Sequence, residues 1–354
     1  MYWNKASVNM SPSIGILGGG QLGKMLAQAA MRLTSVPHIS IYDPNFHSCA
    51  KEISNSFTCG SFSNGKAIMK FAQEVDIITY EFENIPVSVV EPLHNAIQGS
   101  KALQILQHRI KEKEFINSLP GIQCVPYKEV TDGFTYDFPY IVKSTTLGYD
   151  GKGQHLIQSE SDLHHVEIGM TAESYLHPIT EYSLIIARNI NGEITHYPPL
   201  LNEHVNQILE SSTFAHIDKD LEEMMFIKAK QIAVDLNYYG VLTVEFFLHN
   251  RQLYVNEVAP RVHNSGHITL DAANVSQFDL HLYSLLGLKY PNIEIDSSWC
   301  MVNVLGQHYK GIKTHPPAGK FYDYGKNSIQ HNRKVGHING LLKDINLIKE
   351  ARNR

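Results

Sequence analysis

Two acidic residues on neighbouring β-segments are the groups in this sequence best suited to hold a divalent cation. The runs Val241–Leu248 and Leu253–Val258 are rich in β-branched and aromatic residues and predict the two strands of a hairpin. Glu245 and Glu257 are the only acids within these strands, and each has apolar neighbours. Like charges brought together away from water force one carboxyl group to stay protonated, unless a cation lies between them.

The length of the turn decides which residue faces Glu245. A two-residue turn at Asn250–Arg251 places Glu245 opposite Asn256, whereas a three-residue loop places it opposite Glu257. Either register brings both carboxylates to one end of the hairpin. Flanked by Asn256 and Asn264, they offer the hard oxygen ligands that Mg²⁺ prefers, beside substrate phosphates. The alternative is an ordinary hairpin with two half-exposed acids.

A glycine-rich turn near the N-terminus predicts an anion site. Gly18, Gly20 and Gly23 form GxGxxG after a strand and before a helix, and Asp43 ends the next strand. This pattern suits a nicotinamide dinucleotide, so a dehydrogenase is a serious rival interpretation. The N–H groups at a helix N-terminus would donate hydrogen bonds to a ribonucleotide phosphate equally well.

A second glycine loop favours an ATP-dependent enzyme over the dehydrogenase. Lys143 ends the apolar strand FPYIVK, and the following residues, TTLGYDGKGQ (145–154), contain three glycines that let backbone approach phosphates closely. A dehydrogenase does not need a second phosphate-covering loop, a lysine belonging to that loop and a metal-binding acidic hairpin downstream. An ATP-dependent ligase needs all three. A solvated hairpin with a stray lysine is the alternative.

Further polar residues lie in segments expected to face a ligand. Arg261 and His263 follow Pro260 beside the acidic hairpin, where Arg suits phosphate or carboxylate and His suits orientation of a reactant or proton transfer. Glu81 and Glu83 lie two apart at a strand end, so both are expected on one side of it. Glu81 is the preferred substrate contact.

The elements that would carry these groups change character along the chain. Strands and helices alternate over about 13–110, which predicts a parallel, doubly wound sheet with ligands at the strand C-termini. Strands dominate from 138 to 200, with a hairpin signal at Asn191–Gly192. Residues 220–236 and 276–286 predict helices, and the segment after 291 predicts a small mixed domain.

Composition excludes several classes of protein. A chain of 354 residues with 43% hydrophobic and 18% charged residues is typical of a globular protein of two or three domains. The net charge of −5 argues against a nucleic-acid surface, and no apolar run is long enough to span a membrane. The N-terminus lacks a signal peptide, and the four cysteines lack ligand spacing, so we expect reduced thiols and a cytoplasmic protein. Nineteen histidines without HExxH give no zinc signature.

Six motifs together resemble one family. GILGGGQLGKML, YEFENIP, KSTTLGYDGKGQ, NEVAPRVHNSGH, SQFDLHLYSLLG and RKVGH occur in the order found in the N5-carboxyaminoimidazole ribonucleotide synthase family, ATP-grasp carboxylating ligases of purine synthesis. The resemblance implies an α/β fold, α+β in the ATP-grasp part. It divides the chain into a Rossmann-like pre-ATP-grasp domain (1–108), an ATP-grasp domain (109–290) with a lid at about 110–180, and a small C-terminal domain (291–354).

The resemblance also implies an activity. Bicarbonate would attack the γ-phosphate of ATP, and the resulting carboxyphosphate, or CO₂ released from it, would carboxylate aminoimidazole ribonucleotide. Mg²⁺ would be needed, biotin would not, and the enzyme would be a homodimer. Rivals are another ATP-grasp ligase, such as a formate-dependent glycinamide ribonucleotide transformylase or a biotin carboxylase, although the chain has no Met-Lys-Met carrier site.

The resemblance assigns residues to each ligand. The adenine would lie against the linker Glu173–Leu176, and Leu147 stands where many relatives carry a glycine, which predicts a stiffer lid entry. The implied metal ligands are Glu245 and Glu257, and the implied catalytic residues are Lys143, Asp150, Arg261 and His263. The implied ATP-binding residues are Arg109, Lys143, Gly148, Tyr149, Asp150, Gly151, Lys152, Gly153, Gln154, Glu173, Ser174, Tyr175, Leu176, Glu181, His204, Asn256 and Glu257. The implied substrate-binding residues are Gly20, Gln21, Leu22, Glu81, Tyr149, Asp150, Lys152, Arg261, His263, Asn264, Arg333 and Lys334.

Overall fold

The structure is a computed structural model that describes residues 11–146 and 153–352. Within these residues the chain forms two compact units, which are described separately. The first comprises residues 11–81 and 85–97, and the second comprises residues 82–84 and 98–352.

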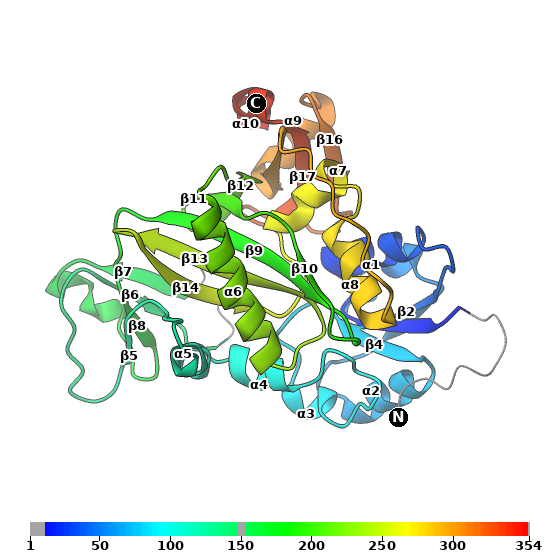
Figure 1. Cartoon of the computed structure of the whole chain (residues 1–354), viewed down its shortest axis with the longest axis horizontal. Helices are drawn as coiled ribbons and strands as arrows, with labels where there is room; N and C mark the ends of the chain where they lie inside the picture. The colour runs from blue at the N-terminus through cyan, green and yellow to red at the C-terminus, as the bar shows by residue number, and fades with distance from the viewer. Residues whose placement is uncertain (1–10, 147–152, 353–354) are drawn as a thin grey trace. The chain divides into compact units, whose positions relative to one another are not determined.

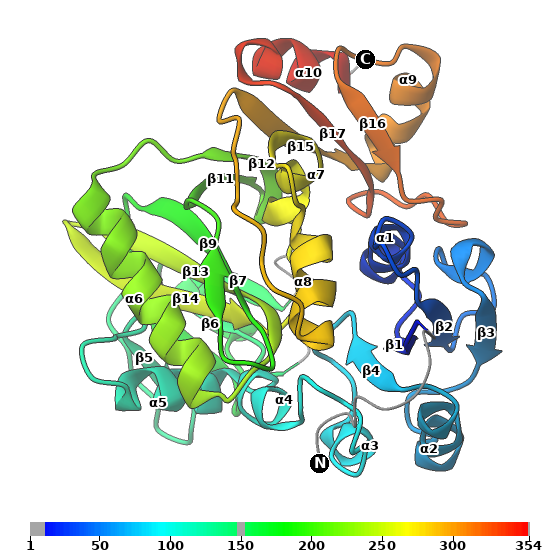
Figure 2. The same ribbon diagram turned by 45° about the vertical axis from the view of Figure 1, so that its right-hand side comes forward.

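The first unit is built on a four-stranded parallel sheet with the order β3-β2-β1-β4. Its elements are β1 (Ser13–Leu17), α1 (Gln21–Ala30), β2 (His38–Asp43), a 3₁₀ turn (Lys51–Ile53), β3 (Ser56–Cys59), α2 (Gly65–Gln73), β4 (Ile77–Tyr80) and α3 (Val87–Val90). The chain turns back after β3, so that α1 and α2 cover opposite faces of the sheet (Figure 2). The predicted alternation of strands and helices is confirmed, although β3, none of whose four residues is buried, was not predicted.

The second unit contains two sheets. An antiparallel sheet of four strands has the order β5-β8-β6-β7, and a sheet of nine strands has the order β14-β13-β9-β11-β12-β15-β17-β16, with β10 paired to β9. The strands are β5 (Tyr127–Glu129), β6 (Tyr140–Lys143), β7 (Gln154–Ile157), β8 (Thr171–Ser174), β9 (Thr180–Arg188), β10 (Ile194–His196), β11 (Leu200–Val205), β12 (Ile208–Phe214), β13 (Gly240–His249), β14 (Gln252–Ala259), β15 (Trp299–Leu305), β16 (Lys320–Asp323) and β17 (Lys334–Leu341).

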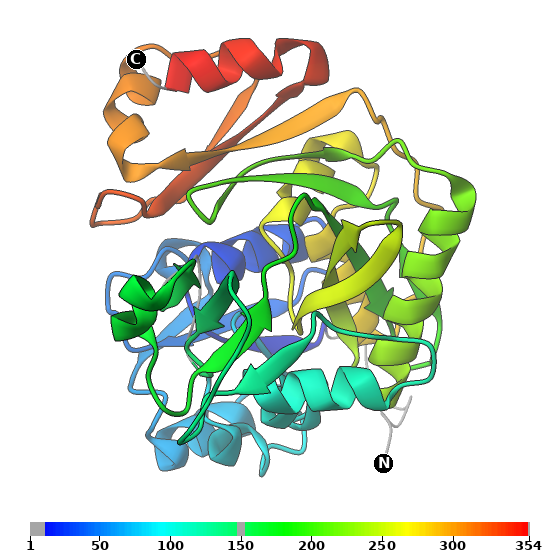
Figure 3. The same ribbon diagram turned by 90° about the vertical axis from the view of Figure 1, so that its left-hand side faces the viewer.

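The described part of the second unit also contains helices, several of which pack on the larger sheet. They are α4 (Lys101–Leu106), α5 (Arg109–Ser118), α6 (Lys219–Asp235), α7 (Thr269–Ala272), α8 (Gln277–Leu286), α9 (Tyr309–Thr314) and α10 (Ile345–Arg352), with 3₁₀ turns at Glu160–His165, Ser265–Ile268, Gly306–His308 and Leu342–Asp344. The helix α6 lies across β9, β13 and β14 (Figure 1), and its Met225, Ala229 and Ile232 are fully buried in the main core. At the other end, α9 and α10 pack on β15 and β17 around a second small core (Figure 3).

The C-terminal segment is not detached from the rest of its unit. The strand β15 hydrogen-bonds β12 in an antiparallel pair, so the sheet continues across residue 290. We therefore keep the three-part division of the chain as a proposal in which the second and third parts share one sheet. Among the described helices, none has the length and apolar character that crossing a membrane requires.

Candidate active site

A β-bulge places the two hairpin acids opposite each other. The turn at Asn250–Arg251 has two residues with φ values of 49° and 64°, which is the left-handed geometry of a tight hairpin. That turn alone would place Asn256 opposite Glu245. The register shifts between Glu245 and Phe246, however, so that Glu245 pairs with Glu257 and Asn256 becomes the extra residue. The two-residue turn is that of the first predicted alternative, whereas the pairing of Glu245 with Glu257 is that of the second.

Glu245 lies in a polar setting that keeps it ionised. His263 Nε2 is 3.2 Å from one carboxylate oxygen, and Asn256 Nδ2 donates a hydrogen bond of 3.2 Å to the other. Burial alone would raise the pKa of Glu245, but the contacts with His263 and the nearby His204 lower it well below its usual value. The Asn256 Oδ1 atom is buried and accepts no hydrogen bond from the described residues. A buried amide oxygen without a partner, on the side chain that hydrogen-bonds Glu245, is a ligand of the type that a hard cation prefers.

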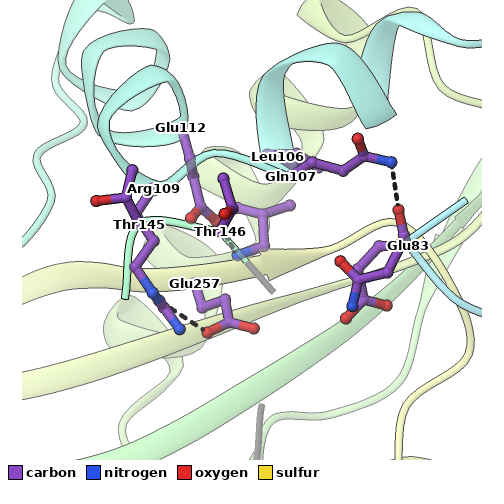
Figure 4. Close-up of a pocket in the computed structure, with 10 residues that line it drawn as sticks. Glu83, Leu106, Gln107, Arg109, Glu112, Thr145, Thr146 and Glu257 are labelled. Atoms are coloured by element: carbon purple, nitrogen blue, oxygen red, sulfur yellow. Dashed lines mark hydrogen bonds and ion pairs between the residues drawn. The ribbon is translucent and has the colours of Figure 1, made fainter. Parts of the chain in front are cut away.

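Glu257 lines a pocket beside the hairpin (Figure 4). Its carboxylate is 3.3 Å from Arg109 Nη1, and Arg109 also donates to the Ser144 carbonyl at 3.2 Å. The pocket is lined by Glu83, Asn84, Leu106, Gln107, Arg109, Glu112, Thr145, Thr146, Glu257 and Val258. Three carboxylates and one guanidinium therefore face a common space.

Glu112 is the most deeply buried of these carboxylates. Only 3% of the residue is exposed, and its Oε1 accepts a 2.7 Å hydrogen bond from the Val258 amide. Burial raises the pKa of Glu112 well above its usual value and the Glu257 charge raises it further, although Arg109 and Lys113 oppose the rise.

This arrangement predicts a pH-dependent stability that Glu112 controls. A carboxyl group whose pKa is raised on folding binds a proton more readily in the folded state. Stability should therefore fall as the pH rises from about 4.5 toward neutrality. Glu112→Gln, which mimics the protonated acid and keeps the acceptor for Val258, should flatten that slope in denaturant titrations of the ligand-free protein. Parallel slopes in the two proteins from pH 5 to 8 would contradict the assignment.

Lys143 shares a buried carboxylate with a second lysine. The register of β6 and β8 places Lys143 and Glu173 diagonally on one face of the sheet, and Lys143 Nζ donates a 2.7 Å hydrogen bond to Glu173 Oε2. Lys113 Nζ, from α5, is 3.0 Å from Glu173 Oε1. Glu173 is 2% exposed. Burial would raise its pKa, but the two lysines lower it to about 2.

The other residues predicted for the nucleotide lie near the hairpin or the smaller sheet. His204 Nδ1 is 2.6 Å from Glu181 Oε2, and this contact raises the pKa of His204 although burial opposes it. Ser174 bonds Tyr136 at 2.8 Å, and Tyr175 and Leu176, which follow β8, are half-buried. Gly153 and Gln154 pair with Ser144 and Lys143, which closes the base of the predicted lid loop. Leu147, Gly148, Tyr149, Asp150, Gly151 and Lys152 lie outside the described residues.

The side chains of the loop after the hairpin hydrogen-bond other residues of the chain. Arg261 makes a two-pronged ion pair with Glu83, one hydrogen bond of which, from Nη2, measures 3.1 Å. His263 Nδ1 lies 2.8 Å from Ser265 Oγ. Asn264 exchanges two side-chain hydrogen bonds with Asn303, of 3.0 and 2.7 Å. Asn264 is therefore committed to Asn303, unlike Asn256, and we no longer expect it to flank the metal.

The backbone amides of the glycine loop in the first unit, which were expected to bind a ligand anion, already donate hydrogen bonds to acidic side chains. Glu81 accepts hydrogen bonds from the Gly20 and Gly23 amides, at 2.6 Å for Gly20, and Asp43 accepts one of 2.7 Å from Gly19. The chain thus supplies its own anions to the N-terminus of α1, where Gln21 and Leu22 also lie. A Cβ atom at Gly23 would collide with the Gly18 carbonyl, which explains that glycine.

The expectation that Glu81 and Glu83 share one side of a strand is wrong. The strand β4 ends at Tyr80, so both residues lie in the irregular segment that follows it. Glu81 bonds the glycine loop of the first unit, whereas Glu83 bonds Arg261 of the second. The spacing rule fails because it requires an extended strand.

The two basic residues predicted in the last part of the chain lie at the start of β17. Lys334 begins that strand and is half-buried, and its charge opposes protonation of His204 and His267. Arg333 Nη1 donates a 2.8 Å hydrogen bond to the Ser328 carbonyl. The charge of Lys334 thus acts on two histidines of the larger sheet and of the loop after the hairpin.

Sequence reasoning missed the two central residues of α5. Glu112 and Lys113 follow Arg109 by three and four positions, which is the spacing of one helical face. That spacing was a usable signal, because Arg109 was already a candidate. The burial of charged residues in a helix as polar as RIKEKEFINS could not be foreseen, since it depends on strands from distant parts of the chain.

Three domain families match the chain in succession. The ribonucleotide synthetase preATP-grasp domain matches residues 11–107, the ATP-grasp domain matches residues 126–278, and the phosphoribosylaminoimidazole carboxylase C-terminal domain matches residues 300–351.

Individual relatives extend this likeness over nearly the whole length. N5-carboxyaminoimidazole ribonucleotide synthase of Staphylococcus aureus (strain COL) is 38% identical, over 98% of this chain and 96% of its own. The crystal structure of N5-carboxyaminoimidazole synthetase from Staphylococcus aureus complexed with ADP superposes with a TM-score of 0.90, at 37% identity and 98% coverage of both chains. Carboxyaminoimidazole ribonucleotide synthase of Aspergillus clavatus, complexed with ATP, gives 0.87 at 26% identity and 96% coverage of both. The chain belongs to the N5-carboxyaminoimidazole ribonucleotide synthase family of ATP-grasp enzymes.

Proposed function

We propose that this protein carboxylates 5-aminoimidazole ribonucleotide to N5-carboxyaminoimidazole ribonucleotide, using ATP and bicarbonate, in purine biosynthesis. The observation that carries the proposal is the pairing of Glu245 with Glu257 beside Arg109 and the buried Lys143, on an ATP-grasp fold. The relatives' names and the ADP and ATP in their structures support the same reaction.

The residues of the hairpin fit a magnesium ion. Glu245 and Glu257 would hold it, and the unpaired Asn256 Oδ1 supplies a third oxygen beside them. When bound, the ion would neutralise charge on the phosphates of the nucleotide. The contact with His263 lowers the pKa of Glu245 although burial opposes this, so that this carboxylate is ready to accept a cation.

The chemistry assigned to the chain has two steps. A bicarbonate oxygen attacks the γ-phosphorus of ATP, so that an O–P bond forms, ADP leaves and carboxyphosphate results. The exocyclic amine of the substrate then forms an N–C bond, phosphate leaves and the nitrogen loses a proton. Lys143 would stabilise charge on the transferring phosphoryl group. Arg261 and His263, held by Glu83 and Glu245, would orient the bicarbonate and the amine.

A substrate comparison tests the proposed reaction. ADP release should require both bicarbonate and aminoimidazole ribonucleotide, and glycinamide ribonucleotide with formate should not replace them. Activity with the formate pair would establish the transformylase instead. Tight NADH binding without ATP binding would establish the dehydrogenase, against which the occupation of the glycine-loop amides by Glu81 and Asp43 already argues. A homodimer and a cytoplasmic location stay predictions.

A further inference from the structure

Lys113 is a buried cation that the proposed reaction does not use. It lies on the inner face of α5, its side chain is 1% exposed, and its Nζ is 3.0 Å from Glu173 Oε1. Burying an isolated ammonium group would cost desolvation free energy, so Lys113 requires an ionic partner that offsets this cost. That partner is the same carboxylate that Lys143 contacts.

The two lysines contact Glu173 in different ways. Lys143 donates a hydrogen bond of 2.7 Å to Oε2, whereas Lys113 approaches Oε1 without hydrogen-bond geometry. Lys113 therefore acts on Glu173 chiefly through its charge. Glu173 in turn can compensate only one of the two ammonium groups, because it carries a single negative charge.

The charge of the cluster follows from this count. Lys113 and Lys143 contribute two positive charges and Glu173 one negative charge, which leaves one net positive charge. The balance is unequal between the lysines. Burial lowers the pKa of Lys143 and the charges of Arg109 and Lys113 lower it further, although Glu173 opposes this, whereas the pKa of Lys113 is raised because Glu173 outweighs its burial. The side chain of Lys143 is 9% exposed and that of Lys113 is 1% exposed, so Lys143 is the ammonium group that an anion can approach.

We propose that Lys113 is a positioning residue for nucleotide binding, which offsets the charge of Glu173 so that Lys143 keeps a net positive charge for the phosphates. Without Lys113, Glu173 and Lys143 would form a neutral pair, and Glu173 would hold Lys143 in place but cancel its attraction for an anion. Glu173 thus fixes the position of Lys143, and the charge of Lys113 keeps the three-residue cluster positive as a whole. The inference rests on the proposed function in one respect, which is that the ligand beside Lys143 is a nucleotide phosphate.

The test is a double-mutant cycle on ADP affinity, which needs no turnover. Lys113→Met keeps the length of the side chain and removes its charge, and it should weaken ADP binding in calorimetry by about tenfold. Glu173→Gln removes the charge that Lys113 offsets. In the Glu173→Gln background, Lys113→Met should therefore change ADP affinity by less than about threefold. A merely structural role for Lys113 would not be relieved by the second substitution.

Each result decides the matter. Unchanged ADP affinity in Lys113→Met overturns the proposal, and so does an equally large loss whether residue 173 is Glu or Gln. If Lys113→Met alone does not fold, as circular dichroism would show, Lys113→Gln replaces it in the cycle, because it also lacks the charge and its amide can hydrogen-bond Glu173. In a kinetic assay the effect should fall on the KM for ATP rather than on kcat. A wild-type protein that binds no ADP would overturn the proposed function as well, which separates the two failures.

Discussion

Replacing Lys143 with methionine is expected to lower the rate of ATP-dependent carboxylation about 10²–10³-fold, the usual cost of removing one charge-stabilising donor from an active site. The ammonium group lies at the end of β6, at the base of the predicted lid, and is held by a 2.7 Å hydrogen bond to Glu173. The fold should survive, because Lys113 remains to pair with Glu173. The measurement is steady-state ADP release with bicarbonate and aminoimidazole ribonucleotide.

A matched control is available in the same small sheet. Lys128 lies on β5 and is exposed, so Lys128→Met removes a positive charge of the same type without touching the buried cluster. Its activity should equal that of the unchanged protein. Near-normal ATP turnover in Lys143→Met would contradict the role assigned to this lysine.

The second large effect concerns the metal. Glu257→Gln removes one of the two proposed ligands and should raise the Mg²⁺ concentration that gives half-maximal activity. Loss of a residue that only supports a metal ligand costs about 10–100-fold in metal affinity, so loss of a ligand itself should cost more. Stability of the ligand-free protein should not fall. The Glu257 charge raises the pKa of the buried Glu112, so its removal relieves a repulsion, even though Arg109 loses a partner.

The control for this variant is an acid far from the hairpin in sequence. Glu129 is exposed on β5, and Glu129→Gln should leave the Mg²⁺ dependence unchanged. A Glu257→Gln protein with an unaltered Mg²⁺ dependence would show that the cation is held elsewhere. A titration of ADP release against Mg²⁺ at saturating ATP distinguishes these outcomes.

Local patterns in the sequence predicted most of the elements. Strands such as His38–Asp43 and helices such as Gln277–Leu286 follow from apolar periodicity and from caps, as with Ser276, whose side chain accepts from the Asp279 amide. The family and the ATP-grasp fold class are confirmed, whereas the boundaries of the three parts stay a prediction. The short strand Ser56–Cys59 was missed because none of its side chains is buried and they carry no alternation.

The site was less predictable wherever it depends on long-range contacts. The pairing of Glu245 with Glu257 required a bulge at Asn256 that neither turn length alone produces. Glu81 occupies the glycine loop that was expected to be open, because a helix N-terminus attracts any nearby anion, including one from the chain itself. The burial of Glu112 and Lys113 depends on strands more than fifty residues away, and no local pattern encodes it.

A structure of the protein with a non-hydrolysable ATP analogue and Mn²⁺, in which anomalous scattering locates the metal, tests the central claim most directly. We expect the metal to be coordinated by an oxygen from both Glu245 and Glu257. A metal bound away from these two carboxylates, or a nucleotide whose phosphates lie far from Lys143, would contradict the account.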